Sequence, residues 1–264
     1  MLTNIPRLLT AIMTTEPGAP WCLDLFCGAG GGGWGYKSAG FNIFGVDIND
    51  QPRYPGWFSR GDALEFLRAY MRYADSYGHV FSMIHASPPC QEYSESRHLR
   101  NACAAVKGYQ INTVKKMIAP TVDLLEQSGL PWVVENVPGA VSELPSSLML
   151  CGSMFDLGVR RHRFFQSSHL LFAPGPCRHA SGFYNVIGGK VRGYGDYASQ
   201  TTYQTSKGEM RRREGYPGKA VGQKAMDIHW MTVSEMPESF PPVFTRWIGQ
   251  QMMRVIAQRG VTHD

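Results

Sequence analysis

A cysteine, a glutamate and two arginines lie in or next to apolar runs and are candidates for catalytic residues. Cys90 follows an apolar run and the residues SPP, and the two prolines stiffen the backbone that carries its sulfur. A thiolate is a strong nucleophile where nearby positive charge lowers its pKa. Glu135 follows another apolar run, where a carboxylate is costly to bury unless it is paired or protonated. Arg161 and Arg163 alternate in RRHRFF and so share one strand face, where two guanidinium groups suit a phosphate, a carboxylate or a base oxygen.

Each of these residues also has a structural interpretation. A single cysteine is most often buried and inert, Glu135 fits a helix cap or an ion pair, and the arginine run fits a solvated basic edge strand. We interpret the other cysteines as structural too. No two of the six cysteines have CxxC spacing, so the sequence predicts neither a zinc site nor any other bound metal.

A glycine cluster follows the apolar run that starts at Trp21. It spans Gly28 to Gly35, and Asp47 ends the next apolar run roughly 20 residues later. A glycine turn of this kind lets the backbone approach a ligand, and the acidic residue accepts hydrogen bonds from ribose hydroxyls. No Gly-Lys-Ser/Thr follows, which excludes a P-loop. The pattern fits NAD, FAD or S-adenosylmethionine, and a glycine turn needed only for packing is the alternative.

Alternating strands and helices must position these groups. Apolar runs predict strands at 21–26, 42–46, 80–85 and 132–134 and another from Phe164, and helical spacing predicts helices at 63–72, 111–127 and 245–258. Pro120 is expected to kink or split the second helix. The alternation predicts a parallel sheet in an α/β fold, with the chemical residues gathered at the carboxyl ends of the strands.

The chain divides into a large unit and a basic insert. Its 264 residues suit one large domain, or one large and one small domain, and 43% apolar and 18% charged residues exclude a disordered chain. We predict a loosely ordered lead-in at 1–18, a catalytic domain at 19–167 and 225–264, and an irregular insert at 168–224. The insert has nine basic and three acidic residues, in a chain of net charge +5, which permits a polyanionic partner. Without a long apolar run or a disulfide framework, we expect no membrane span and a cytoplasmic location, in a prokaryotic or phage-infected cell.

The motifs together resemble those of the C5-cytosine DNA methyltransferases. The segments DLFCGAGGGGWGYKSAGF, GVDIN, GDA, SPPCQ, ENVPG and RRHRFF occur in the order of that family's motifs I, II, III, IV, VI and VIII. The resemblance covers about residues 21–168 and, more weakly, 229–259. It implies a Rossmann-like S-adenosylmethionine-dependent methyltransferase fold with a small irregular insert domain that recognises the target.

The resemblance also assigns roles to residues. It implies that Cys90 is the nucleophile, that Glu135 contacts N3 and the exocyclic amine of cytosine, and that Arg161 and Arg163 contact the base and organise the other two. The implied S-adenosylmethionine site consists of Phe26, Cys27, Gly28, Ala29, Gly30, Gly31, Asp47, Ile48, Asp62, Ala63 and Pro89. The expected nucleic-acid contacts are Gln91, Ser94, Arg97, Arg100, Arg192, Arg211, Arg212 and Arg213.

The implied reaction is methyl transfer to C5 of cytosine in duplex DNA, by a monomer. Addition of Cys90 to C6 would make C5 nucleophilic, on a base that has flipped out of the stack. The short insert predicts a short recognition sequence. Three alternatives stay open: the same chemistry on RNA, transfer of a modified one-carbon group, and a non-catalytic DNA-binding protein on a methyltransferase scaffold.

Overall fold

The computed structural model describes residues 5–15, 18–93, 115–179, 182–187, 190–194, 200–204, 210–214 and 218–260. Within them, a seven-stranded sheet has the strand order β3-β2-β1-β4-β5-β7-β6. Its strands are β1 (Trp21–Leu25), β2 (Asn42–Asp47), β3 (Trp57–Arg60), β4 (Phe81–Ala86), β5 (Trp132–Asn136), β6 (Leu148–Cys151) and β7 (His162–Ser167).

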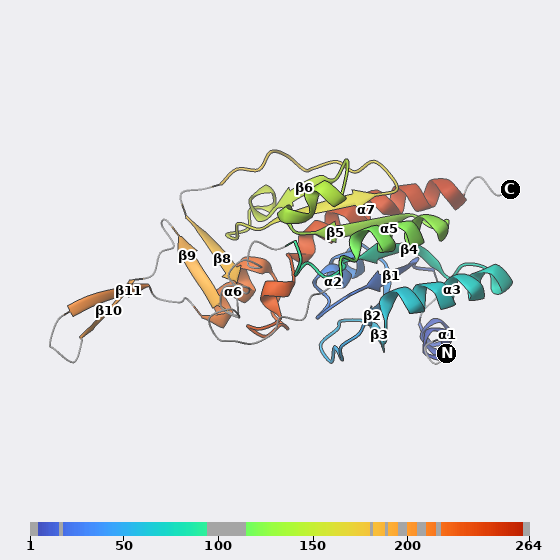
Figure 1. The fold of residues 1–264 in the computed structure, drawn as a ribbon, viewed down its shortest axis with the longest axis horizontal. Helices are drawn as coiled ribbons and strands as arrows, with labels where there is room; N and C mark the ends of the chain where they lie inside the picture. The colour runs from blue at the N-terminus through green and yellow to red at the C-terminus, as the bar shows by residue number, and fades with distance from the viewer. Residues whose placement is uncertain are drawn as a thin grey trace.

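Helices cover both faces of this sheet (Figure 1). The helices are α1 (Ile5–Thr14), α2 (Gly31–Ser38), α3 (Ala63–Tyr77), α5 (Ile118–Gln127), α6 (Lys219–Met226) and α7 (Pro242–Gly260), with 3-10 turns η1 (Pro138–Glu143), η2 (Gly152–Phe155) and η4 (Met236–Glu238). Leu23 and Leu25 pack in one core with α1, α3 and α5, and Cys22 packs in a second core with α2 and α7. Successive side chains of a strand point to opposite faces, so both cores are built from the same strands.

The parallel part of the predicted sheet is confirmed, and one edge differs. β1, β2, β3, β4 and β5 pair in parallel, whereas β7 runs antiparallel to both β5 and β6. The short strands β3 and β6 were not predicted, because neither has a long apolar run. The antiparallel direction of β7 brings its first residues to the edge where β5 ends.

The amino-terminal segment and the α5 region correct two expectations. Residues 5–14 form a helix rather than a loosely ordered lead-in, because Ile5, Leu8 and Ala11 share one buried face. Helix α5 begins at Ile118, so Pro120 lies in its first turn, where its missing N–H costs nothing, rather than at a kink inside a longer helix. Residues 111–114 of the predicted helix lie outside the described residues.

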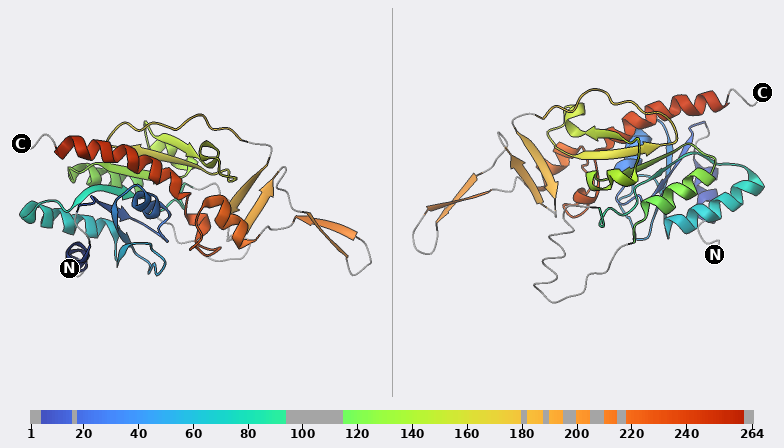
Figure 2. Two further views of the ribbon diagram at one scale, coloured as in Figure 1. Left: turned by 180° about the vertical axis from the view of Figure 1, so that it is seen from behind. Right: turned by 45° about the horizontal axis from the view of Figure 1, so that its top comes forward.

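The insert is more regular than the sequence suggested. It contains two antiparallel pairs, β8 (Phe183–Ile187) with β9 (Lys190–Tyr194) and β10 (Gln200–Gln204) with β11 (Met210–Glu214). Val186 and Val191 of the first pair share a third core with Met226, Ile228 and other residues of 225–236. The second pair lies at the end of the molecule farthest from α3 (Figures 1 and 2). In the part of the chain that the structure describes, every helix is too short or too polar to span a lipid bilayer.

Candidate active site

The predicted catalytic and cofactor-binding segments lie at the edge of the sheet where the parallel strands have their carboxyl ends. β1 leads into the glycine turn, β4 leads into SPPC, and β5 contains Glu135 one residue before its end. Parallel strands place these three ends side by side. Antiparallel β7 adds Arg163, next to Phe164, which pairs with Asn136 at the end of β5.

One cavity of about 270 Å³ unites the predicted groups. Cys90, Glu135 and Arg163 line it together with the predicted cofactor and nucleic-acid residues Phe26, Cys27, Gly28, Ala29, Gly31, Asp47, Ile48, Pro89 and Gln91. The Arg163 Nε atom lies 2.8 Å from Glu135 Oε1, and both side chains are largely buried. Such a buried ion pair fixes both groups in position, because neither charge can be left alone without a large desolvation cost.

Cys90 and Glu135 are both biased toward their protonated forms. Burial raises the pKa of the Glu135 carboxyl above its ordinary value, against the opposing effects of Arg163, a hydrogen bond from Ser87 and the charge of Arg161. Burial, followed by the charge of Glu135, raises the pKa of the Cys90 thiol, and Arg163 and Arg161 only partly offset it. The two arginines therefore favour a thiolate, as expected, but the resting side chain is a thiol.

Arg161 has a different position from Arg163. Its Nη1 atom donates to Val186 O at 3.0 Å and its Nη2 atom donates to Pro237 O. These bonds join the start of β7 to β8 and to η4. The Arg161 Nε atom is buried and has no hydrogen-bond partner in the structure. Sequence reasoning placed both arginines on the base, whereas the hydrogen bonds of Arg161 go to the protein backbone.

A buried histidine connects the site to the core. Tyr36 Oη lies 3.1 Å from His85 Nδ1, and His85 Nε2 lies 3.0 Å from Ser87 Oγ. Burial lowers the pKa of His85 to about 3, so the ring is neutral. The Ser87 hydroxyl donates to Glu135, so the Ser87 oxygen accepts a hydrogen bond from His85 Nε2. The His85 ring proton therefore lies on Nε2, and Nδ1 accepts from Tyr36 Oη. Sequence reasoning missed His85, which lies inside the apolar run before Ser87.

The glycine turn has an unusual backbone held by Asp47. Phe26 has a φ of 55° and Gly28 a φ of 48°. Residues other than glycine rarely adopt such φ angles, and backbone strain of this kind concentrates at functional sites. The Gly28 N–H donates to Asp47 Oδ2 at 3.0 Å, and the Asn49 N–H donates to Asp47 Oδ1 at 2.9 Å. Asp47 therefore fixes the turn while it lines the cavity.

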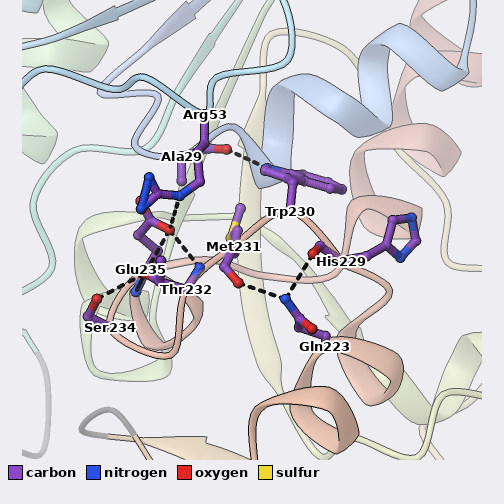
Figure 3. Close-up of polar contacts among 9 residues, drawn as sticks. All are labelled: Ala29, Arg53, Gln223, His229, Trp230, Met231, Thr232, Ser234 and Glu235. Carbon is purple, nitrogen blue, oxygen red and sulfur yellow. Dashed lines mark hydrogen bonds and ion pairs between the residues drawn. The ribbon is translucent and has the colours of Figure 1, made fainter.

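The loop that contains His229 to Glu235 contacts the glycine turn at Ala29 (Figure 3). Trp230 Nε1 donates to Ala29 O at 2.8 Å, and Gln223 Nε2 donates to the carbonyls of His229 and Met231. Glu235 Oε2 accepts from the backbone and the hydroxyl of Thr232 and lies 3.3 Å from Arg53 Nε. These contacts place the loop against the cavity wall.

Three carboxyl groups of the cavity were not found from the sequence. Asp24, Glu235 and Glu238 line it in addition to Asp47. Burial raises the pKa of Asp24 to about 8, although its Oδ2 accepts a hydrogen bond from Tyr54 at 3.0 Å. An aspartate within the apolar run WCLDL was the available signal for Asp24, whereas no pattern marked the two glutamates.

Other predicted residues lie elsewhere. Gly30, Asp62 and Ala63 do not line this cavity, and Asp62 instead caps α3 by accepting from Glu65 N at 2.9 Å. Arg192 is exposed on β9. Arg211, Arg212 and Arg213 lie on β11. Ser94, Arg97 and Arg100 fall outside the described residues.

Comparison with known proteins supports the fold. No protein-family model and no curated sequence matches the chain. A prophage-encoded E. coli protein, described as a candidate DNA modification methyltransferase, superposes with a TM-score of 0.53 at 13% identity, over 91% of this chain and 100% of that one. S. pombe Dnmt2 methyltransferase gives a TM-score of 0.38 at 15% identity, over 59% of this chain and 51% of that one. This chain has the fold of a methyltransferase, in agreement with the C5-cytosine methyltransferase motifs along its sequence.

Proposed function

We propose that this protein methylates C5 of cytosine in DNA with S-adenosylmethionine as the donor. The observation that carries the proposal is the shared cavity. Cys90, Glu135 and Arg163 line the same cavity as the glycine turn, Asp47 and the exposed side chain of Ile48. A nucleophile, a carboxyl group and a cation beside a nucleoside-type site are the groups that methyl transfer to a pyrimidine needs.

The residues present fit this cofactor. S-adenosylmethionine supplies an electrophilic methyl group on a sulfonium, and it also carries an ammonium group. Asp47, Glu235 and Glu238 line the cavity with carboxyl groups, which suits a ligand with two cationic groups. A Cβ atom built on Gly28 would meet nothing within 4 Å, so the backbone there is open to a ligand. Asp47 would hold the ribose, and Phe26 and Ile48 would pack on the adenine.

The proposed chemistry uses three side chains. The Cys90 thiol would lose its proton to water and its sulfur would bond to C6 of cytosine, while Glu135 would donate a proton to N3 and so neutralise the developing charge. Arg163 orients Glu135, because its Nε atom lies 2.8 Å from Glu135 Oε1. The electron pair then available at C5 would take the methyl group as the bond between the sulfonium sulfur and the methyl carbon breaks, which leaves S-adenosylhomocysteine. Loss of the C5 proton to water, departure of the Cys90 thiolate and return of the N3 proton to Glu135 would restore the aromatic ring.

The substrate base must reach the cavity from outside the stack. Cys90 is half-buried in the cavity wall, and stacked duplex DNA cannot place C6 against a sulfur in such a position. Either the cytosine flips out or the substrate is single-stranded. This requirement does not by itself separate DNA from RNA.

Incorporation of labelled methyl groups tests the function. The protein is incubated with labelled S-adenosylmethionine and duplex DNA, single-stranded DNA or RNA, and bisulfite sequencing locates the product. We expect 5-methylcytosine in duplex DNA and none with Cys90→Ser. If methyl groups are found in RNA alone, the proposed DNA substrate is wrong and RNA is the substrate. A methylated atom other than C5 would overturn the mechanism.

A mechanism-based trap tests the nucleophile separately. Fluorine at C5 cannot leave as a proton does, so a 5-fluorocytosine oligonucleotide should stay bonded to the sulfur. Peptide mapping should find the adduct on Cys90. An adduct on Cys27 or Cys151 would overturn the assignment of the nucleophile.

A further inference from the structure

Four side chains of types that commonly bind metals converge outside the lining of the cavity. Cys151 ends β6, His162 begins β7, and Cys177 and His179 lie in the segment after β7. One ligand atom of each residue lies within 4.8 Å of all the others. Three separate parts of the chain therefore bring two sulfur and two nitrogen atoms to one point.

Four of the six separations between these ligand atoms are close to the edges of a small tetrahedron. Cys177 Sγ lies 3.0 Å from His179 Nε2 and 3.5 Å from His162 Nε2, Cys151 Sγ lies 3.6 Å from His179 Nε2, and the two Nε2 atoms are 3.1 Å apart. Zinc bonds of about 2.3 Å to sulfur and about 2.0 Å to nitrogen, at tetrahedral angles, separate the ligand atoms by about 3.3–3.8 Å. The observed separations therefore need only small adjustments around a central ion.

The surroundings of the cluster favour metal binding over a chance hydrogen-bond network. Both imidazoles present the same atom, Nε2, to Cys177 and to each other, and a simple donor-to-acceptor chain does not require this convergence. Ser153 Oγ lies 3.4 Å from Cys177 Sγ and accepts the Arg178 N–H at 3.2 Å. The Ser153 hydroxyl is thereby positioned to donate to a Cys177 thiolate, as groups that support metal ligands commonly do.

We propose that Cys151, His162, Cys177 and His179 form a structural zinc site. Two thiolates and two neutral imidazoles balance the charge of Zn²⁺, and four protein ligands leave no open position for a substrate. This inference replaces the expectation of a metal-free protein, and it does not depend on the proposed methyl transfer. The spacing C-x10-H-x14-C-x-H has no CxxC pair, which explains why the sequence pattern did not reveal it.

The position of the site gives the ion a role in the architecture. His162 stands between Arg161, which is bonded to β8 and η4, and Arg163, which is paired with Glu135. Cys177 and His179 lie in the stretch that leads from β7 toward β8 (Figure 1). A bound zinc would fasten the start of β7 to β6 and to the chain that enters the insert, and so would hold both arginines in place.

Zinc content is the direct test. The protein is purified with a tag that contains no histidine, passed over a chelating resin, and measured by inductively coupled plasma mass spectrometry. We expect about one zinc per chain, as a closed four-ligand site retains its ion. Cys177→Ser and His179→Asn should lower this content at least about tenfold, because each removes one of the four ligands.

Matched variants serve as controls. Cys22→Ala and His229→Asn remove a thiol and an imidazole outside the cluster, so they should keep about one zinc per chain. Circular dichroism shows whether each variant is folded. Cobalt reconstitution gives a second readout on the unsubstituted protein, since Co²⁺ with thiolate ligands in a tetrahedral site has strong visible absorption.

Three results would overturn the proposal. The first is an unsubstituted protein that neither contains zinc nor binds added Zn²⁺ or Co²⁺ after reduction. The second is a disulfide between Cys151 and Cys177 that persists in protein purified from the reducing cytoplasm. The third is unchanged zinc content in folded Cys177→Ser and His179→Asn.

Discussion

At the level of single residues, burial and then the charge of Glu135 favour the protonated thiol of Cys90. Each group has a raised pKa, and for Cys90 the charge of Glu135 is one of the causes. A protonated Glu135 is what N3 of a cytosine requires as the charge develops, and a thiol protects the resting enzyme from unwanted reactions. The thiolate of Cys90 is therefore favoured by the charges of Arg163 and Arg161 and opposed by a charged Glu135.

Glu135→Gln should separate the reactivity of Cys90 from turnover. The change removes the negative charge that raises the Cys90 pKa and leaves Arg163 free to lower it, so the inflection of Cys90 alkylation should move to lower pH. We expect alkylation by iodoacetamide at pH 8 to accelerate several-fold, because a larger fraction of the Cys90 thiol is then ionised. Methyl transfer should fall by roughly 10² to 10⁴, because the proton donor is lost.

Peptide mapping of Cys90 alone measures the alkylation rate, and Glu126→Gln on the exposed surface of α5 is the matched control. Slower alkylation in Glu135→Gln would contradict this account of the thiol.

Asp24 should make the protein less stable as pH rises. Its pKa of about 8 in the folded state lies well above the value of about 3.9 in an unfolded chain. Between those pH values the unfolded chain releases a proton that the folded protein keeps, so the free energy of unfolding falls, by up to about 1.4 kcal/mol per pH unit. Asp24→Asn should flatten this dependence between about pH 4 and pH 8.

Thermal denaturation at several pH values measures the effect, with Asp75→Asn on the exposed face of α3 as the control. An equally steep fall in Asp24→Asn would show that other groups cause it.

At the scale of elements, the sequence predicted what depends on local patterns. Apolar runs predicted β1, β2, β4, β5 and β7, and the ordered motifs predicted that Cys90 and Glu135 share an edge of the sheet. Residues brought together by folding alone were missed. Glu235 and Glu238 belong to a loop without periodicity, and the four ligands of the proposed zinc site come from three separate segments. Asp62 was placed on the cofactor by its motif, whereas in the structure it caps α3.

The loop that contacts the glycine turn should contribute to cofactor affinity. Trp230→Phe keeps an aromatic ring beside Trp34, whose ring centroid lies 5.4 Å from that of Trp230, but it removes the hydrogen bond to Ala29 O. A hydrogen bond contributes about 0.5–1.5 kcal/mol, so the Kd for S-adenosylhomocysteine should rise by about 2- to 10-fold. Calorimetric titration measures this change.

Trp247→Phe is the matched control, because Trp247 Nε1 donates a similar bond to Phe172 O away from the cavity. Equal loss of affinity in the two variants would assign the effect to general destabilisation.

In the whole molecule, the candidate active-site cavity and most of the excess positive charge lie in different parts of the chain. The cavity lies at the edge of the large sheet, whereas the insert carries nine basic and three acidic residues in a chain of net charge +5. The remainder of the chain is therefore close to neutral. An arrangement of this kind lets one part attract a polyanion through its phosphates while another acts on a single base.

The insert should provide the salt-dependent part of DNA binding. Arg211, Arg212 and Arg213 lie on β11, at the opposite end of the molecule from α3 (Figure 2). Replacing all three with alanine should weaken binding and reduce the slope of log K against log salt by up to about 2.7, since each lost phosphate contact removes about 0.9. Binding measured by fluorescence anisotropy from low to moderate salt gives this slope. Arg68→Ala, Arg72→Ala and Arg254→Ala remove the same charge from exposed positions on α3 and α7. If that control variant flattens the slope as much as the insert variant does, net charge alone drives binding and the insert has no special part in it.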